Sequence, residues 1–495
     1  MAVGKKGMKH KSSEYNKYSG YRIIAFRSCA LFFLILFLIP TCSANDVAEI
    51  NSVNTPKGAV ILIVDGLSSC YVYPEYTPYA IDGSVLEKAE PENILQIFDQ
   101  SCRVLDVTAP QTFTEGGHSV IATGYSKADS VLVGSFGTTI YDVAHDNGYL
   151  TFAIMEKGDS SGIRSKQNVI IHDAKNSITE PEMVIETNML SGIGKSISLS
   201  VADLMQENSL ELQDQLDEYA EGSQQIYDAY DIWAIDTAID LIDHMENEYP
   251  EQHYILTINV GAVDCAGHYK KNSGYVATIE GIDNATMNLY ETCLEKDMAF
   301  ILTGDHGMSF STANSRGGHQ ADKYSVMTES QKVPLVIAAK DVDIGIIEGQ
   351  FGQEDVAPTI LEVLNLPGKL RAADGTAIPV KDYVNLKVNV PEEGKLILMR
   401  NNEILFENTI NEAISFIGLE PDIDYVLKYA SSSDSDDEIE KLINVGSSTI
   451  VDMFTSPKQP TSDKSYQNPR YIVGGTLIGA VNLAGLILIR KVLKE

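Results

Sequence analysis

Aspartate and histidine side chains follow separate apolar runs of this chain, and their recurrence is its strongest chemical signal. Residues 59–64 lead into Asp65, and residues 254–260 are followed by Asp264 and, four residues later, by His268. Carboxylate and imidazole groups are ligands that zinc and manganese accept in proteins. If the runs are strands of one sheet, these side chains gather at one edge and predict a metal site.

A second set of the same residue types follows later in the chain. Residues 300–302 lead into Asp305 and His306, and His319 lies on the next loop. One Asp-Gly pair after a strand is most often a turn, but the chain has only 9 histidines and three of them belong to this pattern. Six such ligands exceed what a tetrahedral zinc takes. We therefore expect two divalent metal ions, zinc first, with manganese or magnesium as alternatives.

A threonine hydroxyl is the candidate nucleophile. Residues 103–107 form a further apolar run, which leads through Thr112 and Thr114 to a helix-like segment, residues 119–122. A hydroxyl at such a junction lies beside free backbone N–H groups that favour a phosphoryl oxygen. Metal coordination would lower its pKa and make it a nucleophile. Either threonine could instead only cap the helix.

The net charge narrows the class of partner. The 495 residues include 69 acidic and 37 basic side chains, which gives a formal net charge of -32. This field repels the nucleic-acid backbone, so we expect no nucleic-acid partner. An anionic substrate would need local positive charge, and bound metal ions supply it in an acidic protein.

The elements that must position these side chains alternate along the chain. Short β-branched runs separated by helix-like stretches predict an α/β fold with a mostly parallel central sheet flanked by helices. In such folds the chemistry lies at the carboxyl ends of the strands. The predicted strands are residues 59–64, 103–107, 150–155, 254–260, 299–302 and 333–338, and the predicted helices are residues 119–122, 138–145, 232–247, 278–294 and 355–366.

Three segments depart from this alternation. Residues 159–231 are polar, and they predict a cap-like insertion over the site. Residues 383–430 contain short strand candidates separated by turn residues, which predict a small C-terminal all-β module. Residues 431–470 are acidic and serine-rich, then polar with prolines, and they predict a flexible stalk. The α/β domain is expected to span residues 57–382.

Both ends of the chain predict membrane targeting. Residues 1–44 combine a basic leader with an apolar run that stops at Pro40, which is typical of a signal peptide, cleaved after Ala44 or retained as an anchor. Residues 471–489 are charge-free and nearly all apolar, about 28 Å long as a helix, enough for one transmembrane helix. Arg490 follows it, so we expect a cytoplasmic C-terminus and an extracellular body at the cell membrane.

The lipid bilayer is therefore an expected partner. Gly475 and Gly479 in the predicted membrane helix have a spacing by which two helices could pair, which would give a homodimer. Lipid-facing glycines would show the same spacing. The other expected partner is a phosphorylated small-molecule substrate.

The ordered set of motifs resembles the alkaline phosphatase superfamily, which includes phosphodiesterases, cofactor-independent phosphoglycerate mutases and sulfatases. The resemblance spans the predicted α/β domain, and it favours Thr114 over Thr112 because the interval to Thr123-Gly124 matches the family spacing. It implies two metal sites. One would use Asp264, His268 and His319, and the other Asp65, Asp305, His306 and the hydroxyl of Thr114.

The implied function is a membrane-anchored extracellular hydrolase that cleaves phosphate monoesters through a phosphothreonine. The residues after Thr114 are Glu-Gly-Gly-His, which match neither the sulfatase motif Cys/Ser-x-Pro-x-Arg nor the Phe-Pro-Asn of phosphodiesterases. Phosphodiester hydrolysis or phosphoryl transfer on envelope or nucleotide substrates is one alternative, and an inactive surface-binding protein is another. No phosphate-binding arginine matches by motif, and the candidates for substrate binding are Lys157, Arg164 and Arg316.

Overall fold

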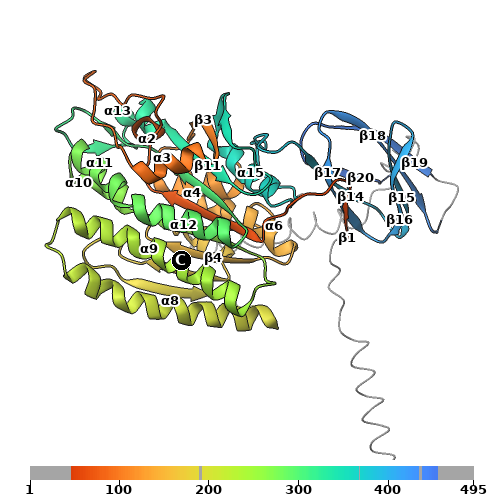
Figure 1. Cartoon of the computed structure of the whole chain (residues 1–495), viewed down its shortest axis with the longest axis horizontal. Coiled ribbons are helices and arrows are strands. Elements are labelled where there is room, and N and C mark those ends of the chain that lie inside the picture. Colours follow the sequence, from red (N-terminus) through yellow and green to blue (C-terminus); the bar gives the residue numbers. More distant parts are fainter. Residues whose placement is uncertain (1–45, 189–191, 367, 434–437, 455–495) are drawn as a thin grey trace, which may run out of the picture. The chain divides into compact units, whose positions relative to one another are not determined.

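A ten-stranded sheet forms the centre of the α/β part of the chain (Figure 1). The computed structural model describes residues 46–188, 192–366, 368–433 and 438–454. The strands stand in the order β12-β3-β11-β8-β2-β7-β4-β5-β6, and β13 pairs with β3. Their bounds are β2 Gly58–Val64, β3 Cys102–Thr108, β4 Leu150–Met155, β5 Val169–Asp173, β6 Met183–Thr187, β7 Tyr254–Val260, β8 Met298–Gly304, β11 Lys332–Ala338, β12 Gly345–Ile347 and β13 Phe351–Gly352.

The three central strands β8, β2 and β7 are parallel and end at the same level. Val64 at the end of β2 pairs with Gly304 of β8 on one side and with Val260 of β7 on the other. Every residue of these strands is buried, because helices cover both faces of the sheet. The residues that follow the three strands are therefore brought to one edge of the sheet.

Side chains of each central strand alternate between two hydrophobic layers. In β2, Val60 and Leu62 pack into one layer, and Ala59 and Ile61 pack into the other. Figure 1 shows the long helices α8 and α9 side by side over the first layer. The first layer contains α3 Glu92–Asp99, α8 Ile193–Asp217, α9 Gln224–Glu248, α11 Asn272–Gly281 and α12 Asp283–Glu295, and the second contains α4 Thr114–Thr123, α6 Ile140–Asp146, α7 Ser161–Lys166 and α15 Val356–Val363.

The sheet is mixed, which corrects the expectation of a parallel strand at residues 333–338. Strand β11 runs antiparallel to both of its neighbours, β3 and β8, and the edge strand β6 runs antiparallel to β5. The connection from β8 to β11 contains no element longer than 4 residues, so the chain does not cross the sheet and enters β11 from the same edge. A fully buried strand is apolar in either direction, so its amino-acid pattern does not reveal this.

Residues 159–231, which were predicted to be a cap-like insertion, contribute regular elements to the α/β part. They include β5 and β6, which extend the central sheet, the helix α8 and the start of α9. Ile197, Val201 and Met205 recur every four residues and place one face of α8 in the core. The polar residues lie on the opposite face of the helix, so the overall composition concealed this amphipathic pattern.

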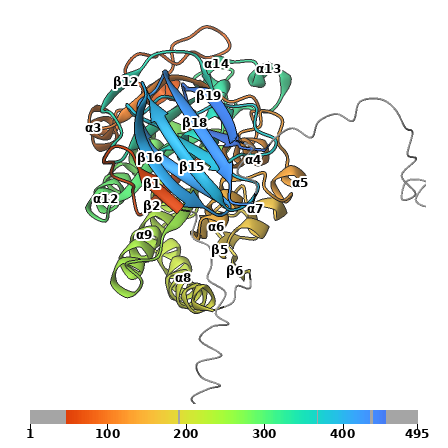
Figure 2. The same ribbon diagram turned by 90° about the vertical axis from the view of Figure 1, so that its right-hand side faces the viewer.

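The residues after 383 form a small all-β module, as predicted. One of its sheets has the order β1-β17-β14-β20, and the other has the order β16-β15-β18-β19. Figure 2 shows the strands of the second sheet side by side, facing the viewer. Phe406 packs edge-to-face on Phe416, with ring centroids 5.1 Å apart. The bounds are β1 Asp46–Glu49, β14 Val384–Asn389, β15 Gly394–Arg400, β16 Glu403–Ile410, β17 Ala413–Leu419, β18 Ile423–Ser431, β19 Glu438–Val445 and β20 Thr449–Asp452.

A polar stalk was predicted at residues 431–470, but β19 and β20 lie in the first part of this range, and residues 455–470 lie outside the described residues. Burial alternates along β19, and a strand with one packed face is half polar, so its composition is similar to that of a linker. No helix in the described part of the chain has the length and hydropathy that a bilayer crossing requires. The leader predicted at residues 1–44 and the helix predicted at residues 471–489 lie outside the described residues.

Candidate metal centre

Three adjacent strand ends carry most of the predicted ligands. Asp65 directly follows β2, and Asp305 and His306 directly follow β8. Asp264 lies in the first turn of α10 (Ala262–Tyr269), which begins two residues after β7. Because the three strands end at one level, these side chains meet at the carboxyl edge of the sheet, where α/β folds bind their ligands.

The first group of ligand atoms comes from Asp264, His268 and His319, and we call it the outer group. One helical turn separates Asp264 from His268, so both side chains lie on one face of α10. Oδ1 of Asp264 lies 3.4 Å from Nε2 of His268 and 3.3 Å from Nε2 of His319. The two Nε2 atoms lie 2.9 Å apart. The side chain of His268 is 36% exposed, so this group is open to solvent.

The second group comes from Asp65, Asp305 and His306, whose side chains are fully buried, and we call it the inner group. Nε2 of His306 lies 3.4 Å from Oδ1 of Asp65 and 3.5 Å from Oδ2 of Asp305. Ligand atoms of Asp65, Asp264 and His306 all lie within 4.8 Å of one another. The resemblance implied that Asp264 serves one metal only, whereas the structure places it between both groups.

Thr114 is the first residue of α4, and its hydroxyl faces the inner group. Its Oγ1 lies 3.5 Å from Oδ1 of Asp65 and 3.4 Å from Nε2 of His306. The N-cap of α4 is Phe113, so Thr114 is not the capping residue of the helix. Gly117 allows this approach, because a Cβ there would overlap the backbone of the inner group. The structure therefore places the Thr114 hydroxyl between a carboxylate and an imidazole.

Thr112, the alternative nucleophile, contacts the backbone of His319 instead. Its Oγ1 donates to the carbonyl oxygen of His319 at 2.9 Å, and Nδ1 of His319 donates to the carbonyl oxygen of Thr112 at 2.7 Å. Nδ1 of His306 donates to the carbonyl oxygen of Gly307 at 3.1 Å. These bonds place the proton of each imidazole on Nδ1, and they leave the Nε2 lone pair available to a cation.

Buried carboxylate oxygens in both groups fit a pair of cations. Oδ2 of Asp65, Oδ1 of Asp264 and Oδ2 of Asp305 receive no hydrogen bond from the described residues. A buried oxygen without a donor is costly unless a cation satisfies it. Two of these oxygens lie among imidazole nitrogens, and mixed carboxylate and imidazole sets suit zinc or manganese. The residues present therefore fit the metals that their types predict.

Burial and mutual repulsion shift the pKa values of the carboxyl groups in the two ligand groups. Burial, together with the charges of Asp305 and Asp264, raises the pKa of Asp65 well above its usual range. Burial also raises the pKa of Asp305 to about 7. Burial acts in the same direction on Asp264, but the Lys157 ammonium and the nearby outer histidines outweigh it and hold the pKa of Asp264 low. Bound cations would relieve this repulsion.

Two of the three substrate-binding candidates border the same open cleft as Thr114, which has a volume of about 420 Å³. Nζ of Lys157 donates to Oδ2 of Asp264 at 2.9 Å, so this cation already contacts the outer group. Nη1 of Arg164 donates to Oδ2 of Asp159 at 2.7 Å, and its Nε lies 3.3 Å from Glu186. Arg164 therefore reaches the cleft with its charge largely neutralised.

Arg316 does not border this cleft. It is exposed on the loop before β10 (Gly317–Gly318), and its guanidinium carbon lies 5.9 Å from the ring centroid of Tyr269. Sequence reasoning missed other residues of the cleft, namely Glu115, Asp159, Ser160 and Asn176. Asp159 follows the end of β4 by four residues, a position that the strand-end rule could have found. Asn176 lies between β5 and β6, and no sequence signal pointed to it.

Buried polar side chains hold the loops that carry the ligands. The Tyr275 hydroxyl donates to the carbonyl oxygen of Gly66 at 2.7 Å. Nε2 of Gln353 donates to the carbonyl oxygens of Gly304 at 2.9 Å and Asp305 at 2.8 Å. The backbone N–H of Gly66 donates to Oδ1 of Asp305 at 2.9 Å, which joins two of these loops. Such contacts orient ligands, but they join residues far apart in the chain and leave no local sequence pattern.

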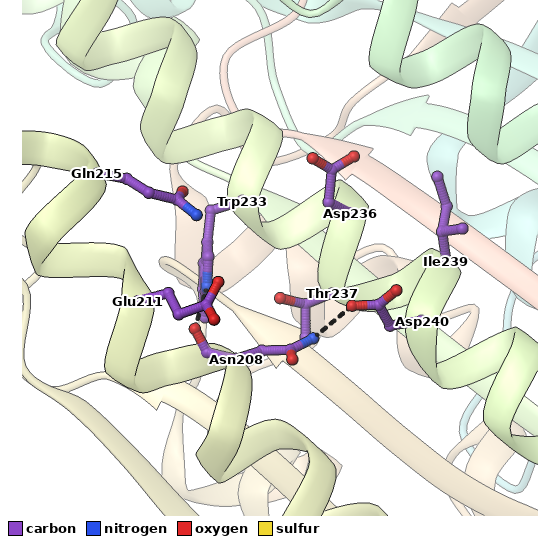
Figure 3. Close-up of a pocket in the computed structure, with 8 residues that line it drawn as sticks. All are labelled: Asn208, Glu211, Gln215, Trp233, Asp236, Thr237, Ile239 and Asp240. Atoms are coloured by element: carbon purple, nitrogen blue, oxygen red, sulfur yellow. Dashed lines mark hydrogen bonds between the residues drawn. The ribbon is translucent and has the colours of Figure 1, made fainter.

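A second hollow lies between α8 and α9, and Figure 3 shows the residues that line it. Its volume is about 330 Å³, and Glu211, Asp236 and Asp240 give it an acidic lining. Nε1 of Trp233 donates to the carbonyl oxygen of Asn208 at 2.9 Å. The lining contains no histidine and shares no residue with the two ligand groups. This hollow therefore lacks the mixed carboxylate and imidazole set that the two ligand groups have.

Comparison with known proteins supports the resemblance that the motifs indicated. Residues 173–368 match the model of the Metalloenzyme superfamily, a stretch that contains Asp264, His268, Asp305, His306 and His319. The 2,3-bisphosphoglycerate-independent phosphoglycerate mutase of Anaplasma phagocytophilum is 26% identical over 139 residues, which are 28% of this chain and 27% of that protein. The mutase of Onchocerca volvulus is 28% identical over 119 residues, 23% of this chain and 22% of that protein. The chain thus matches about a quarter of the length of these relatives.

Solved structures with a similar fold include the alkaline phosphatase PafA, with a TM-score of 0.46 at 12% identity, covering 67% of this chain and 100% of that chain. The lipoteichoic acid synthase LtaP from Listeria monocytogenes has a TM-score of 0.44 at 11% identity, covering 72% of this chain and 85% of that chain.

Proposed function

We propose that the chain is a two-metal hydrolase that cleaves phosphate monoesters with Thr114 as the nucleophile. One observation carries the proposal: the Thr114 hydroxyl lies 3.5 Å from Asp65 and 3.4 Å from His306, beside two groups of cation ligands that share Asp264. A nucleophile next to a pair of cations is the arrangement that phosphoryl transfer needs.

Each ligand group has a distinct place in this proposal. Asp264, His268 and His319 would hold one cation, and Asp65, Asp305 and His306 would hold the other together with the Thr114 hydroxyl. Asp264 also has a ligand atom within 4.8 Å of those of Asp65 and His306, so it would serve both cations. Bound cations would lower the pKa of this hydroxyl and neutralise charge on the oxygens around phosphorus. Zinc is the first candidate because the six Asp and His side chains offer oxygen and nitrogen donors, and manganese is the second.

The residues of the chain would carry out two displacements. The Thr114 hydroxyl loses its proton to solvent, and its Oγ1 attacks phosphorus. The bond between phosphorus and the alcohol oxygen breaks, and the alcohol takes a proton from solvent and leaves through the open cleft. Water then cleaves the phosphothreonine and releases phosphate. Lys157 borders the cleft and supplies positive charge beside Asp264, so it would orient the phosphoryl oxygens of the substrate. Arg164 would contact the leaving group.

Transfer of the phosphoryl group to a second alcohol is the other candidate reaction. The sequence matches to phosphoglycerate mutases and the open cleft beside Thr114 favour it, because a cleft open to water also admits a second acceptor. In that reaction the product is a new phosphate ester and little free phosphate is released.

The proposal includes a location. The basic leader at residues 1–44 and the apolar segment at residues 471–489 support anchoring in the cell membrane with the α/β domain outside. Protease added to intact cells should digest the α/β domain. Protection of the domain until the cells are lysed would contradict this location.

The reaction is tested with the full-length protein in detergent and p-nitrophenyl phosphate. Turnover should disappear with a chelator and return with zinc or manganese. Thr114→Ala should lower turnover by roughly 10⁴-fold or more while the metal content stays unchanged, because the nucleophile is lost. Thr112→Ser is the matched control and should stay active. Unchanged turnover in the Thr114→Ala variant would remove Thr114 from the role of nucleophile. No metal-dependent turnover in the wild type would refute the proposed reaction and favour an inactive surface-binding protein.

A further inference from the structure

Two buried carboxyl groups meet at the start of the helix that carries the outer ligands. Glu156 follows β4 directly, and Asp231 lies on α9; both are fully buried. Oε2 of Glu156 accepts a hydrogen bond from the backbone N–H of Gly261 at 2.6 Å. Oδ1 of Asp231 accepts one from the N–H of the next residue, Ala262, at 2.8 Å. Two side chains from different elements thus hold two consecutive amides.

These amides belong to the beginning of α10. The first N–H groups of a helix have no partner within it, and the N-cap residue Gly261 has no side chain to supply one. Glu156 and Asp231 satisfy this need, so they tie the first turn of α10 to β4 and α9. Asp264 lies in that turn and His268 lies one turn later, so any movement of the helix start moves both outer ligands together.

The remaining oxygens of the two carboxyl groups indicate a shared proton. Oε1 of Glu156 and Oδ2 of Asp231 receive no hydrogen bond from any other described residue, and the two side chains interact with each other. Two carboxylates contain no hydrogen that could join them. One proton held between the groups would give each free oxygen a partner, as in other closely paired carboxyl groups.

The surroundings favour the singly charged pair. The titratable groups that face it are Tyr230, Asp228, Cys265 and Lys157, of which only Lys157 is a cation, and its Nζ contacts Asp264. A second negative charge would therefore be buried without a direct counter-ion. Burial, followed by repulsion from Asp231, raises the pKa of Glu156, and burial raises the pKa of Asp231 to about 7.

We propose that Glu156 and Asp231 are positioning residues that share one proton, hold the first turn of α10 and thereby place Asp264 and His268 for the outer cation. This inference rests on the proposed two-metal function. The pair touches neither substrate nor metal and acts only through the backbone of Gly261 and Ala262.

The test measures zinc affinity and stoichiometry of the full-length protein in detergent by competition with a chromophoric chelator. The wild type should bind two ions. Glu156→Ala and Asp231→Ala should weaken the outer ion by about 10–100-fold while the inner ion remains, since outer-shell partners typically contribute that much. Glu156→Gln and Asp231→Asn should stay within roughly threefold of the wild type, because an amide accepts the same backbone bond and supplies the hydrogen that the pair shares.

A control variant separates positioning from stability. Asp142→Ala removes a carboxylate that accepts two backbone N–H groups at the start of α6 but contacts neither ligand group. It should lower the melting temperature and leave both zinc affinities unchanged. If the alanine variants do not fold, Glu156→Asp withdraws the carboxyl group from Gly261 and should weaken the outer ion about tenfold.

The outcomes distinguish this inference from the function on which it rests. A wild type that binds no zinc refutes the two-metal function. A wild type that binds two ions, with Glu156→Asp and both alanine variants binding them equally well, refutes the positioning role alone. Amide variants that lose the outer ion as the alanine variants do would overturn the shared proton.

Discussion

The α/β part and the C-terminal β module differ in whether their buried polar side-chain atoms have hydrogen-bond partners. Among the described residues, all buried side-chain oxygens and nitrogens without a hydrogen-bond partner lie between Asp65 and Glu362. The strands β14 to β20 contain none of them. Unsatisfied buried groups are costly, and they persist where a ligand or a shared proton satisfies them.

This difference indicates that the α/β part contains the candidate site and that the module contributes to stability. In the α/β part the unsatisfied atoms include Asp65, Asp264 and Asp305 in the ligand groups and Glu156 and Asp231 behind them. In the module, by contrast, no buried side-chain oxygen or nitrogen of a described residue lacks a hydrogen-bond partner. Substitutions in the two regions should therefore produce opposite phenotypes.

The largest effect is expected at Asp264, which belongs to the outer group and also lies within 4.8 Å of ligand atoms of the inner group. Asp264→Ala removes a shared ligand, so it should lower turnover by at least 10³-fold and reduce the content of both metal ions. Metal analysis by mass spectrometry and turnover of p-nitrophenyl phosphate measure this. Asp243→Ala, an exposed position on α9, is the control. Full metal content in the Asp264→Ala variant would contradict the sharing of this ligand.

A substitution in the module should produce the opposite result. Phe416 is fully buried, and Phe416→Ala should lower the free energy of unfolding by about 3–5 kcal/mol through the cavity that it leaves. Turnover per folded molecule should not change. Phe406→Ala, at its more exposed aromatic neighbour, should cost less. Denaturant unfolding together with turnover tests this, and a parallel loss of activity in folded Phe416→Ala protein would show that the module takes part in catalysis.

The close approach of α4 to the inner group predicts a smaller effect. Gly117→Ala would place a Cβ against the carbonyl oxygen of Asp305, so the helix must shift and move Thr114 with it. Turnover should fall by about 10–100-fold, because small misplacements of a nucleophile are costly. Gly134→Ala, where an added Cβ makes only ordinary contacts, is the control and should remain active. Equal activity of both variants would show that the spacing of α4 is not critical.

The smallest effect concerns pH and the buried Lys381, whose Nζ donates to the carbonyl oxygens of Glu362 at 3.0 Å and Val363 at 2.8 Å. Burial lowers the pKa of Lys381 from 10.5 to about 8. Between these values the folded protein has lost this proton and the unfolded chain keeps it, so raising the pH favours the folded state. The contribution is at most about 1.4 kcal/mol per pH unit.

Lys381→Met removes this contribution. The free energy of unfolding of the wild type minus that of the variant should therefore increase from pH 8 to pH 10, as measured by urea unfolding at each pH. A difference that stays constant or shrinks over this range would contradict the lowered pKa.

Much of the fold was predictable because its strands are fully buried. Strands predicted at residues 150–155 and 254–260 agree with β4 and β7 residue for residue, since continuous apolar runs with abrupt polar ends mark their limits. The helix predicted at residues 278–294 is two helices, α11 and α12, which meet at Ile282. Both have apolar faces on the same layer, so periodicity alone did not separate them.

The candidate site was predictable in its members and less so in its arrangement. The ligand types and their positions after strands pointed to Asp65, Asp264 and Asp305 together with three histidines. The sequence did not show that Asp264 lies between both groups, or that Thr112 bonds the backbone of His319. These relations depend on the register of β8, β2 and β7 and on the approach of α4.

By itself the amino-acid sequence determined which segments are buried strands, which residues follow them, and that carboxylates and imidazoles are placed at their ends. Local chemistry and hydrophobic periodicity carry that information. Only the tertiary structure decided the direction of β11, the role of residues 159–231 in the sheet, and the pairing of Glu156 with Asp231 beneath α10. These features arise from contacts between residues far apart in the chain, and such contacts are set by the joint packing of the elements and not by any local pattern.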